Sequence, residues 1–181
     1  LTVLDRTAPV VSCPDAVTRE CTGPQTQVAL SATATDGCAG QLPTTGPTDA
    51  TYPVGVTSVA FGSADACGNS AQCTSSVTIV DTTAPAITCP QNTAVECNAL
   101  GAATGVDGGT ATAADLCGAA TVSSDAPADG RYPLGVTRTI HTATDEHGND
   151  VTCVSTVTVS DTTKPTLSCP ADLTIECNAP N

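Results

Sequence analysis

The amino-acid sequence predicts an all-β protein built from tandem immunoglobulin-like, fibronectin III-like antiparallel β-sandwiches. Apolar residues alternate with Thr and Ser along short segments such as 73–80 and 151–159, and this period of two is typical of strands. Gly or Pro interrupts the sequence about every eight to twelve residues, as expected between the short strands of a sandwich. No segment places apolar residues at helical spacing, and one set of motifs occurs more than once.

The repeated motifs define the domain organisation. The segment 5–14 returns as 81–90 and again, in part, as 161–170, so Asp5 corresponds to Asp81 and Asp161. Further matches follow in the same order: Glu20-Cys21 with Glu96-Cys97 and Glu176-Cys177, Tyr52–Val56 with Tyr132–Val136, Ala64–Asn69 with Thr144–Asn149, and Cys73 with Cys153. Such self-similarity at a fixed period indicates an array of structural repeats.

We therefore divide the chain into four parts. Residues 1–4 align with the end of each repeat, residues 5–80 and 81–160 are complete repeats, and residues 161–181 hold the first strands of a third. Because both ends fall inside a repeat, we expect the natural protein to be longer.

The combined motifs resemble the HYR (hyalin repeat) domain. They are Asp-Thr-Thr-x-Pro, Cys-Pro, Glu-Cys, Ala-Thr-Asp, Tyr-Pro-x-Gly-Val-Thr, Thr-Asp-x-x-Gly-Asn and a final Cys, and together they cover essentially the whole chain. The resemblance implies an immunoglobulin-like extracellular module that occurs in tandem in adhesive, matrix and bacterial surface proteins, with no catalytic residues. The sequence departs from the usual pattern at Tyr52 and Tyr132, where Phe is common, and in its extra cysteines.

Charge and composition exclude several classes of function. With 5 Lys or Arg against 18 Asp or Glu, the formal charge is −13, which argues against a nucleic-acid partner. No apolar run is long enough to span a membrane. Neither a nucleophile elbow nor a phosphate-binding loop is present, so we expect neither an enzyme nor an organic cofactor. His141 and His147 occur in one repeat only, and we expect both at the surface.

The 11 cysteines include no Cys-x-x-Cys pair, which favours disulfides and an extracellular or cell-surface location. The first and last strands of such a sandwich are neighbours, so Cys13–Cys73 and Cys89–Cys153 are the expected bonds.

The other cysteines depend on which end of the sandwich they occupy. Strands expected near 28–35 and 57–64 finish where the first strand begins, so Cys38 and Cys67 meet there and can bond. Cys21 lies at the opposite end, facing the next repeat, which predicts a Cys21–Cys117 bond across the junction. A Cys97–Cys117 bond that leaves Cys67 free stays open as the alternative. We expect the partners of Cys97, Cys169 and Cys177 in repeats that follow.

Carboxylates recur at the same end of each repeat. The set that we expect to gather near the junctions comprises Asp5, Asp36, Asp65, Asp81, Asp115, Asp145 and Asp161. Converging carboxylates suit Ca²⁺, although Asp also favours turns because its side chain bonds nearby backbone amides. Both interpretations stay open here.

The function expected from the sequence is an extracellular structural or adhesive array, a disulfide-stapled stalk or filament whose partners are neighbouring repeats or subunits of the same protein. The alternative is an accessory module of a secreted enzyme that binds a cell-surface glycan or a protein. Such a module would favour exposed aromatic side chains, and the chain has only two Tyr, one Phe and no Trp.

Overall fold

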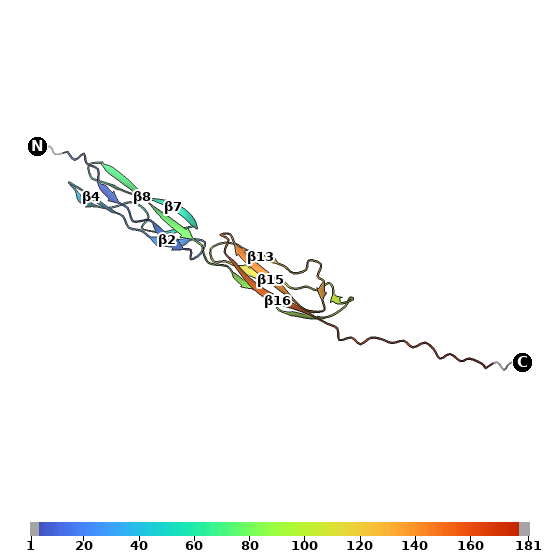
Figure 1. Ribbon diagram of the computed structural model, residues 1–181. Helices are drawn as coiled ribbons and strands as arrows, with labels where there is room; N and C mark the ends of the chain where they lie inside the picture. The colour runs from blue at the N-terminus through green and yellow to red at the C-terminus, as the bar shows by residue number, and fades with distance from the viewer. Residues whose placement is uncertain (1–3, 178–181) are drawn as a thin grey trace.

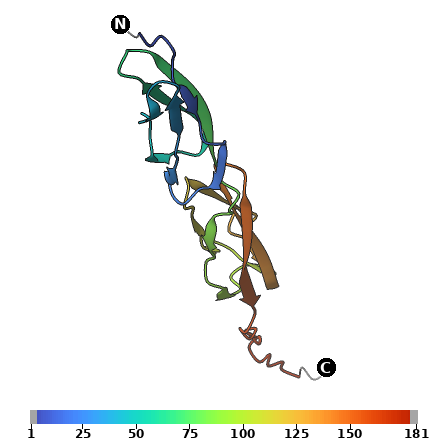
Figure 2. The ribbon, with the colours of Figure 1, turned by 90° about the vertical axis from the view of Figure 1, so that its left-hand side faces the viewer.

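The computed structural model describes residues 4–177, of which those up to Ser160 form two β-sandwiches placed end to end along a rod (Figure 1). A view turned by 90° shows the same end-to-end arrangement, with the segment after Ser160 leading away from the second sandwich (Figure 2). The prediction of tandem all-β sandwiches is confirmed. Within the described range no helix is long and apolar enough to cross a membrane.

The first repeat contains three small sheets. Their strand orders are β1-β4-β5, β2-β8-β7 and β3-β6. The strands are β1 (Val10–Ser12), β2 (Val17–Glu20), β3 (Thr26–Ala29), β4 (Thr33–Asp36), β5 (Gly40–Leu42), β6 (Asp49–Tyr52), β7 (Gly55–Ala64) and β8 (Ser70–Val80).

The expected first strand is divided between the two faces of the sandwich. β1 pairs antiparallel with β4, whereas β2 pairs parallel with β8, with Val17 opposite Val77. Pro14 lies between the two halves, and because proline lacks an N–H it cannot continue a ladder. The sandwich is therefore antiparallel except for this pairing, which a purely antiparallel prediction did not include.

The strand expected at 28–35 is also divided. β3 pairs with β6 and β4 pairs with β1 and β5, so the chain changes sheets between Ala29 and Thr33. Leu30, in the connection, is buried and its amide donates to the carbonyl of Thr48. Val28, Leu30 and Ala34 keep the same alternation across the change, which is why the sequence pattern did not show it.

The second repeat follows the same plan. Its largest sheet has the order β10-β16-β15-β13, again with the parallel pairing of β10 and β16, and the two-stranded sheets β11-β14 and β12-β9 complete it. The strands are β9 (Ala86–Thr88), β10 (Thr93–Glu96), β11 (Ala102–Ala103), β12 (Thr112–Ala114), β13 (Ala120–Ser124), β14 (Tyr132–Pro133), β15 (Gly135–Asp145) and β16 (Asp150–Ser160).

The long hairpins β7-β8 and β15-β16 each contribute buried side chains to the core of their repeat, but the residue types differ. In the first repeat the inward residues of β7 include Val59 and Phe61. In the second repeat the corresponding inward residues of β15 are Thr139 and His141, each 1% exposed. The expectation of a surface histidine at 141 is therefore wrong, because the strand's period of two turns this position inward.

The polar core of the second repeat is only partly hydrogen-bonded. His141 Nε2 lies 2.9 Å from the hydroxyl of Ser155, whereas His141 Nδ1 and Thr139 Oγ1 are buried without a partner. Because an unsatisfied buried polar group costs about 1–3 kcal/mol, these two atoms lower the stability of the second repeat, as Oδ2 of Asp36 and the hydroxyl of Tyr52, which are also buried without a partner, do in the first.

Gly46 provides a test of the packing in the first core. Its φ is +135°, and a Cβ there would lie 2.6 Å from Cδ1 of Phe61 and 2.9 Å from the carbonyl oxygen of Ala60. We expect Gly46→Ala to lower the free energy of unfolding by about 1–3 kcal/mol, measured as a lower Tm by calorimetry. Gly37→Ala, with nothing within 4 Å of the added Cβ, is the control; equal melting temperatures for the two variants would contradict the analysis.

Candidate functional site: the junction between the two repeats

A disulfide between Cys21 and Cys117 joins the two repeats. The two residues are 96 positions apart in sequence and their Cα atoms lie 6.1 Å apart. Cys21 follows β2 at the end of the first sandwich, and Cys117 lies in the turn between β12 and β13 of the second. Both are buried, and Cys117 belongs to the apolar cluster of the first repeat. The bond therefore makes the second repeat contribute a side chain to the core of the first.

Glu20, next to this cysteine, holds the linker between the repeats. Its Oε1 accepts hydrogen bonds from the amide of Thr82 (2.7 Å) and the hydroxyl of Thr83 (3.1 Å), and its Oε2 accepts one from the hydroxyl of Thr82 (3.0 Å). The amide of Cys21 donates to the carbonyl of Val80 at 2.8 Å. The linker is thus hydrogen-bonded to the end of β2 at Val80, Thr82 and Thr83.

These bonds lower the pKa of Glu20 below its ordinary value of 4.5, and the largest cause is the amide of Thr82. A lowered pKa in the folded state means that the ionised form supports the folded linker. This support is complete above the ordinary pKa and is lost as the pH falls through the lowered one. The linker is therefore expected to loosen only in acid.

On the side of the second repeat, Asp81 is held by the turn between β15 and β16. Asp81 is buried, its Oδ2 lies 3.2 Å from Nδ1 of His147, and its carbonyl oxygen accepts from Nδ2 of Asn149 at 3.1 Å. Asp145 shapes this turn, because its carboxylate accepts from the amides of His147 and Asn149 and from the Asn149 side chain. The start of the second repeat is therefore anchored at one end of that repeat.

Of the seven predicted acidic residues, the structure brings together two pairs, Asp5 with Asp36 and Asp81 with Asp145, and it shows no trio of them within the described residues. Ligand atoms within 4.8 Å of one another occur in the groups Asp5–Asp36–Cys38, Asp81–Asp145–His147, Cys21–Asp81–Cys117 and Glu96–Cys97–Asp161. Asp65 and Asp115 belong to none of these groups. The carboxylate of Asp65 accepts from the amides of Cys67 and Asn69 and from the Asn69 side chain, and one oxygen of Asp115 accepts from the amides of Cys117 and Gly118.

Two further disulfides lie within the repeats. Cys13 bonds to Cys73 and Cys89 to Cys153, each pair with its Cα atoms 5.9 Å apart. Among the described residues, free thiols are present on the five other cysteines, which are Cys38, Cys67, Cys97, Cys169 and Cys177. The predicted Cys38–Cys67 bond is therefore not formed in the structure, and neither is the alternative Cys97–Cys117 bond, since Cys117 is bonded to Cys21.

Glu20, the two threonines and the Asn149 side chain have roles at the junction that the sequence reasoning did not assign. Glu-Cys and Asp-Thr-Thr each recur in the sequence, but they are about 60 residues apart. Only the parallel register of β2 and β8, with Glu20 opposite Val80, brings them together. Both motifs recur, but Glu20 and Thr82 are 62 positions apart whereas Glu96 and Thr162 are 66 apart, so the recurrence alone does not pair them.

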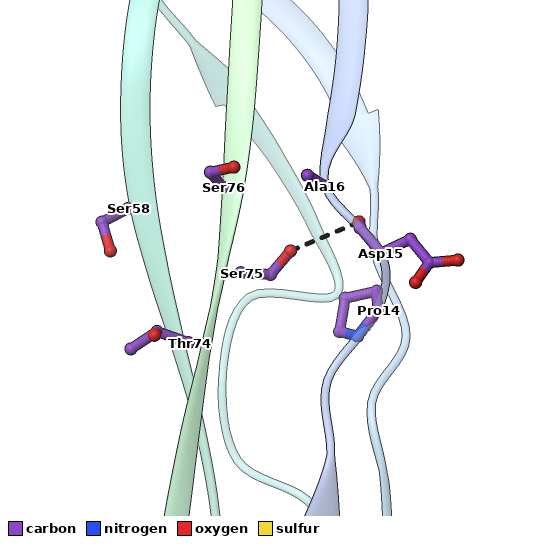
Figure 3. A pocket seen from close by; sticks show the side chains of 7 residues that line it. All are labelled: Pro14, Asp15, Ala16, Ser58, Thr74, Ser75 and Ser76. Carbon is purple, nitrogen blue, oxygen red and sulfur yellow. Dashed lines mark hydrogen bonds between the residues drawn. The ribbon is translucent and has the colours of Figure 1, made fainter.

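A surface hollow lies away from this junction, between β7, β8 and the segment that connects β1 to β2 (Figure 3). It has a volume of about 460 Å³ and is lined by small residues, of which Asp15 alone is titratable. Ser75 Oγ donates to the carbonyl of Asp15 at 3.3 Å, so this hydroxyl already has a backbone partner. The lining offers no pair of nucleophile and base.

Comparison with known proteins identifies the family. The HYR domain matches the chain twice, over residues 4–79 and 80–159. The chain belongs to the HYR domain family. The resemblance inferred from the motifs is confirmed.

One similar protein agrees with this assignment. Hyalin of Strongylocentrotus purpuratus is 35% identical over 92% of the chain, and the chain spans 15% of hyalin. Among solved structures, the protocadherin GammaB4 extracellular domain matches 89% of this chain and 33% of its own at 14% identity, with a TM-score of 0.38. Mouse cadherin-23 EC22–24 matches 87% of this chain and 66% of its own at 16% identity, with a TM-score of 0.35.

Glu20→Gln tests the linker. The amide can replace only part of the carboxylate's acceptor capacity and loses the stronger, charge-assisted bonds, so we expect greater motion between the two repeats at pH 7 with little change in either core. The measurement is ¹⁵N relaxation of backbone amides in each repeat, in which loosening makes the two rotational diffusion tensors diverge.

The matched control is Glu176→Gln in the exposed C-terminal segment. We also expect the wild type to approach the variant's behaviour below pH 4.5, the ordinary pKa of Glu20. If the variant and the wild type tumble identically at pH 7, Glu20 does not restrain the linker.

Proposed function

We propose that the chain is a stiff segment of an extracellular structural or adhesive repeat array. The observation that carries this proposal is the closed junction, in which Cys21–Cys117 and the Glu20 hydrogen bonds fix one sandwich on the next. A linker between two domains ordinarily permits relative motion. Here a covalent bond and a bonded linker oppose that motion, which suits a stalk or filament that must transmit force or hold a distance.

An extracellular location is supported by the cysteine chemistry. Three disulfides in so short a chain are typical of proteins that fold in an oxidising compartment. The family supports the same location and a role without catalysis, and the hollow in Figure 3 offers no catalytic pair. The partners in this proposal are neighbouring repeats or subunits of the same protein.

The alternative, a glycan-binding or protein-binding accessory module of a secreted enzyme, is less well supported. The three aromatic side chains of the chain are all buried, with exposures of 6% for Tyr52, 2% for Phe61 and 1% for Tyr132. Stacking on a sugar ring needs an exposed aromatic face. A cell-surface glycan is therefore a weaker candidate partner than another repeat.

The segment 161–177 supports the association of repeats. It carries Leu167, Leu173 and Ile175, which are exposed at 89%, 83% and 78%. Leu167 corresponds to Val11 and Ile87, which begin the first two sandwiches. This segment fits as the opening strands of a third sandwich, completed either by the same chain or by a neighbouring subunit through strand addition.

Removal of the junction disulfide tests the proposal. We expect Cys21→Ser/Cys117→Ser to leave both sandwiches folded but to broaden the distribution of angles between them. Small-angle X-ray scattering measures this as a shorter mean maximum dimension, and electron microscopy measures it as bent particles. The double variant Cys38→Ser/Cys67→Ser is the control, because it also removes two sulfurs. An unchanged angle distribution without the bond would contradict the stiff-segment function.

Calcium binding is a second proposal, and it rests on Asp36. This residue is 8% exposed, and its Oδ2 is buried without a hydrogen-bond partner. A carboxylate oxygen of Asp5 lies within 4.8 Å of a carboxylate oxygen of Asp36. An unpaired carboxylate oxygen beside a second carboxylate suits a hard cation. Asp65 and Asp145 fit less well, because the backbone and side-chain amides of their own turns already occupy both carboxylate oxygens.

We expect 1–5 mM Ca²⁺, on the order of the affinity of extracellular calcium modules, to raise the Tm of the first repeat, and EDTA to reverse the rise, since a ligand that binds only the folded state stabilises it. Asp36→Asn removes the response and Asp15→Asn keeps it. A Tm that is insensitive to both Ca²⁺ and EDTA would end this second proposal and leave the stiff-segment function untouched.

A further inference from the structure

Each outer end of the two repeats resembles one side of the junction between them. The end that carries Cys97 resembles the Cys21 side, and the end that carries Cys38 resembles the Cys117 side. We propose that Cys38 and Cys97 are the open halves of two further inter-repeat disulfides, each made with a neighbouring repeat of the same kind. The partner of Cys97 is the cysteine equivalent to Cys117 in a following repeat, and the partner of Cys38 is the cysteine equivalent to Cys21 in a preceding one. This proposal rests on the proposed function and extends it from one junction to a disulfide at every junction between successive repeats.

The end that carries Cys97 reproduces the first half of the junction. Glu96 accepts from the amide and hydroxyl of Thr162 at 2.6 and 2.9 Å and from the hydroxyl of Thr163 at 3.2 Å. Glu20 makes the same three bonds to Thr82 and Thr83.

The cysteine next to this glutamate is held in the same way. The amide of Cys97 donates to the carbonyl of Ser160 at 2.8 Å, as that of Cys21 does to Val80. Asp161 lies beside Cys97, as Asp81 lies beside Cys21. The thiol of Cys97 is therefore presented in the setting in which Cys21 is bonded.

The end that carries Cys38 reproduces the other half. One oxygen of Asp36 accepts from the amides of Cys38 and Ala39 at 2.8 and 2.9 Å. One oxygen of Asp115 accepts from the amides of Cys117 and Gly118 at 2.7 and 2.9 Å. The same turn thus positions both cysteines.

The surroundings of the two cysteines also match. A carboxylate oxygen of Asp5 lies within 4.8 Å of the Cys38 sulfur, as one of Asp81 does of the Cys117 sulfur. Asn69 donates to the carbonyl of Asp5, as Asn149 does to that of Asp81. The main difference is exposure. Cys117 is buried against the first repeat, whereas Cys38 is exposed, as expected of a contact surface without its partner.

The completed junction also shows which role Cys67 has. Its counterpart is His147, which lies in the turn between β15 and β16 and faces Asp81 at 3.2 Å without contributing to the bond. A bond from Cys38 to a preceding repeat therefore needs nothing from Cys67. The Cys38–Cys67 bond expected from the sequence is the competing outcome.

The environment of both thiols lowers the fraction that is ionised. Burial raises the pKa of the Cys97 thiol, and the negative charges of Asp161 and Glu96 raise it further. The charge of Asp5 is the largest cause of the raised pKa of Cys38. Because thiolates are the species that attack disulfides, both cysteines have less of the reactive form than an ordinary thiol at the same pH.

The chemistry requires a two-electron oxidant. Two thiols lose two protons and two electrons as the S–S bond forms, and the electrons pass by thiol–disulfide exchange to a disulfide donor, which is reduced to two thiols. Small disulfides and the oxidised dithiol catalysts of secretory compartments belong to this class.

The Cys97 bond is tested by a chain in which a second copy of residues 81–160 follows residue 160. After refolding with oxidised and reduced glutathione, pepsin digestion at low pH and mass spectrometry without reduction, we expect a peptide that links Cys97 to the second copy of Cys117. Cys97→Ser in the first copy removes this peptide and leaves the second copy of Cys117 free to alkylate, whereas Cys67→Ser changes nothing. If Cys97 of the first copy is free or is bonded to any cysteine other than Cys117 of the second copy, the proposal for this end is overturned.

The Cys38 bond is tested by a chain in which residues 5–80 occur twice before residues 81–181. The expected peptide links Cys21 of the first copy to Cys38 of the second, and a bond between Cys38 and Cys67 within the second copy overturns the proposal. Circular dichroism establishes that each chain is folded, and the native protein mapped in the same way provides an independent readout. The bending measurement on the 181-residue chain does not depend on either result, so the stiff-segment function can fail or stand separately.

Discussion

The structure depends on the small size of each core and on the covalent bonds that compensate for it. A sandwich of 76–80 residues buries only about 60% of the surface of its unfolded chain, and here each core contains at most two aromatic side chains. The bonds Cys13–Cys73 and Cys89–Cys153 close loops of 60 and 64 residues. In the entropic account each such closure destabilises the unfolded chain by about 4 kcal/mol, which is comparable to the whole stability of a small domain.

The same constraint explains the construction of the junction. Once a domain is too small to bury much surface of its own, burying the contact between two domains is one of the few further gains available. Cys117 enters the apolar cluster of the first repeat, so the S–S bond is both a tether and a core contact. Glu20 then holds the linker at the edge of that contact. The same bond therefore both opposes motion between the two repeats and adds a contact to the core of the first.

Much of the fold could be predicted from the sequence, because strand periodicity and internal repetition are local signals. Alternation along Cys73–Val80 is enough to place Val77 and Ile79 inside, and both are buried. The change of sheet between β3 and β4 could not be predicted, because the alternation through Leu30 continues across it. His141 was misjudged because its residue type was given more weight than its position on β15. The roles of Glu20 and Asn149 could not be predicted either, because each depends on contacts more than 60 residues away in sequence.

Most of the acidic residues near the ends of the repeats accept hydrogen bonds from nearby backbone amides and hydroxyls. A charge of −13 suggests at first a surface that needs cations. Yet the carboxylates of Asp65 and Asp145 accept hydrogen bonds from the amides of their own turns, and those of Glu20 and Glu96 accept hydrogen bonds from the threonines that follow β8 and β16. Each of these carboxylates compensates the backbone donors of a segment that has no strand partner. These acids therefore satisfy irregular backbone at the ends of a sandwich, and Asp36 differs from them in having a buried oxygen without a hydrogen-bond partner.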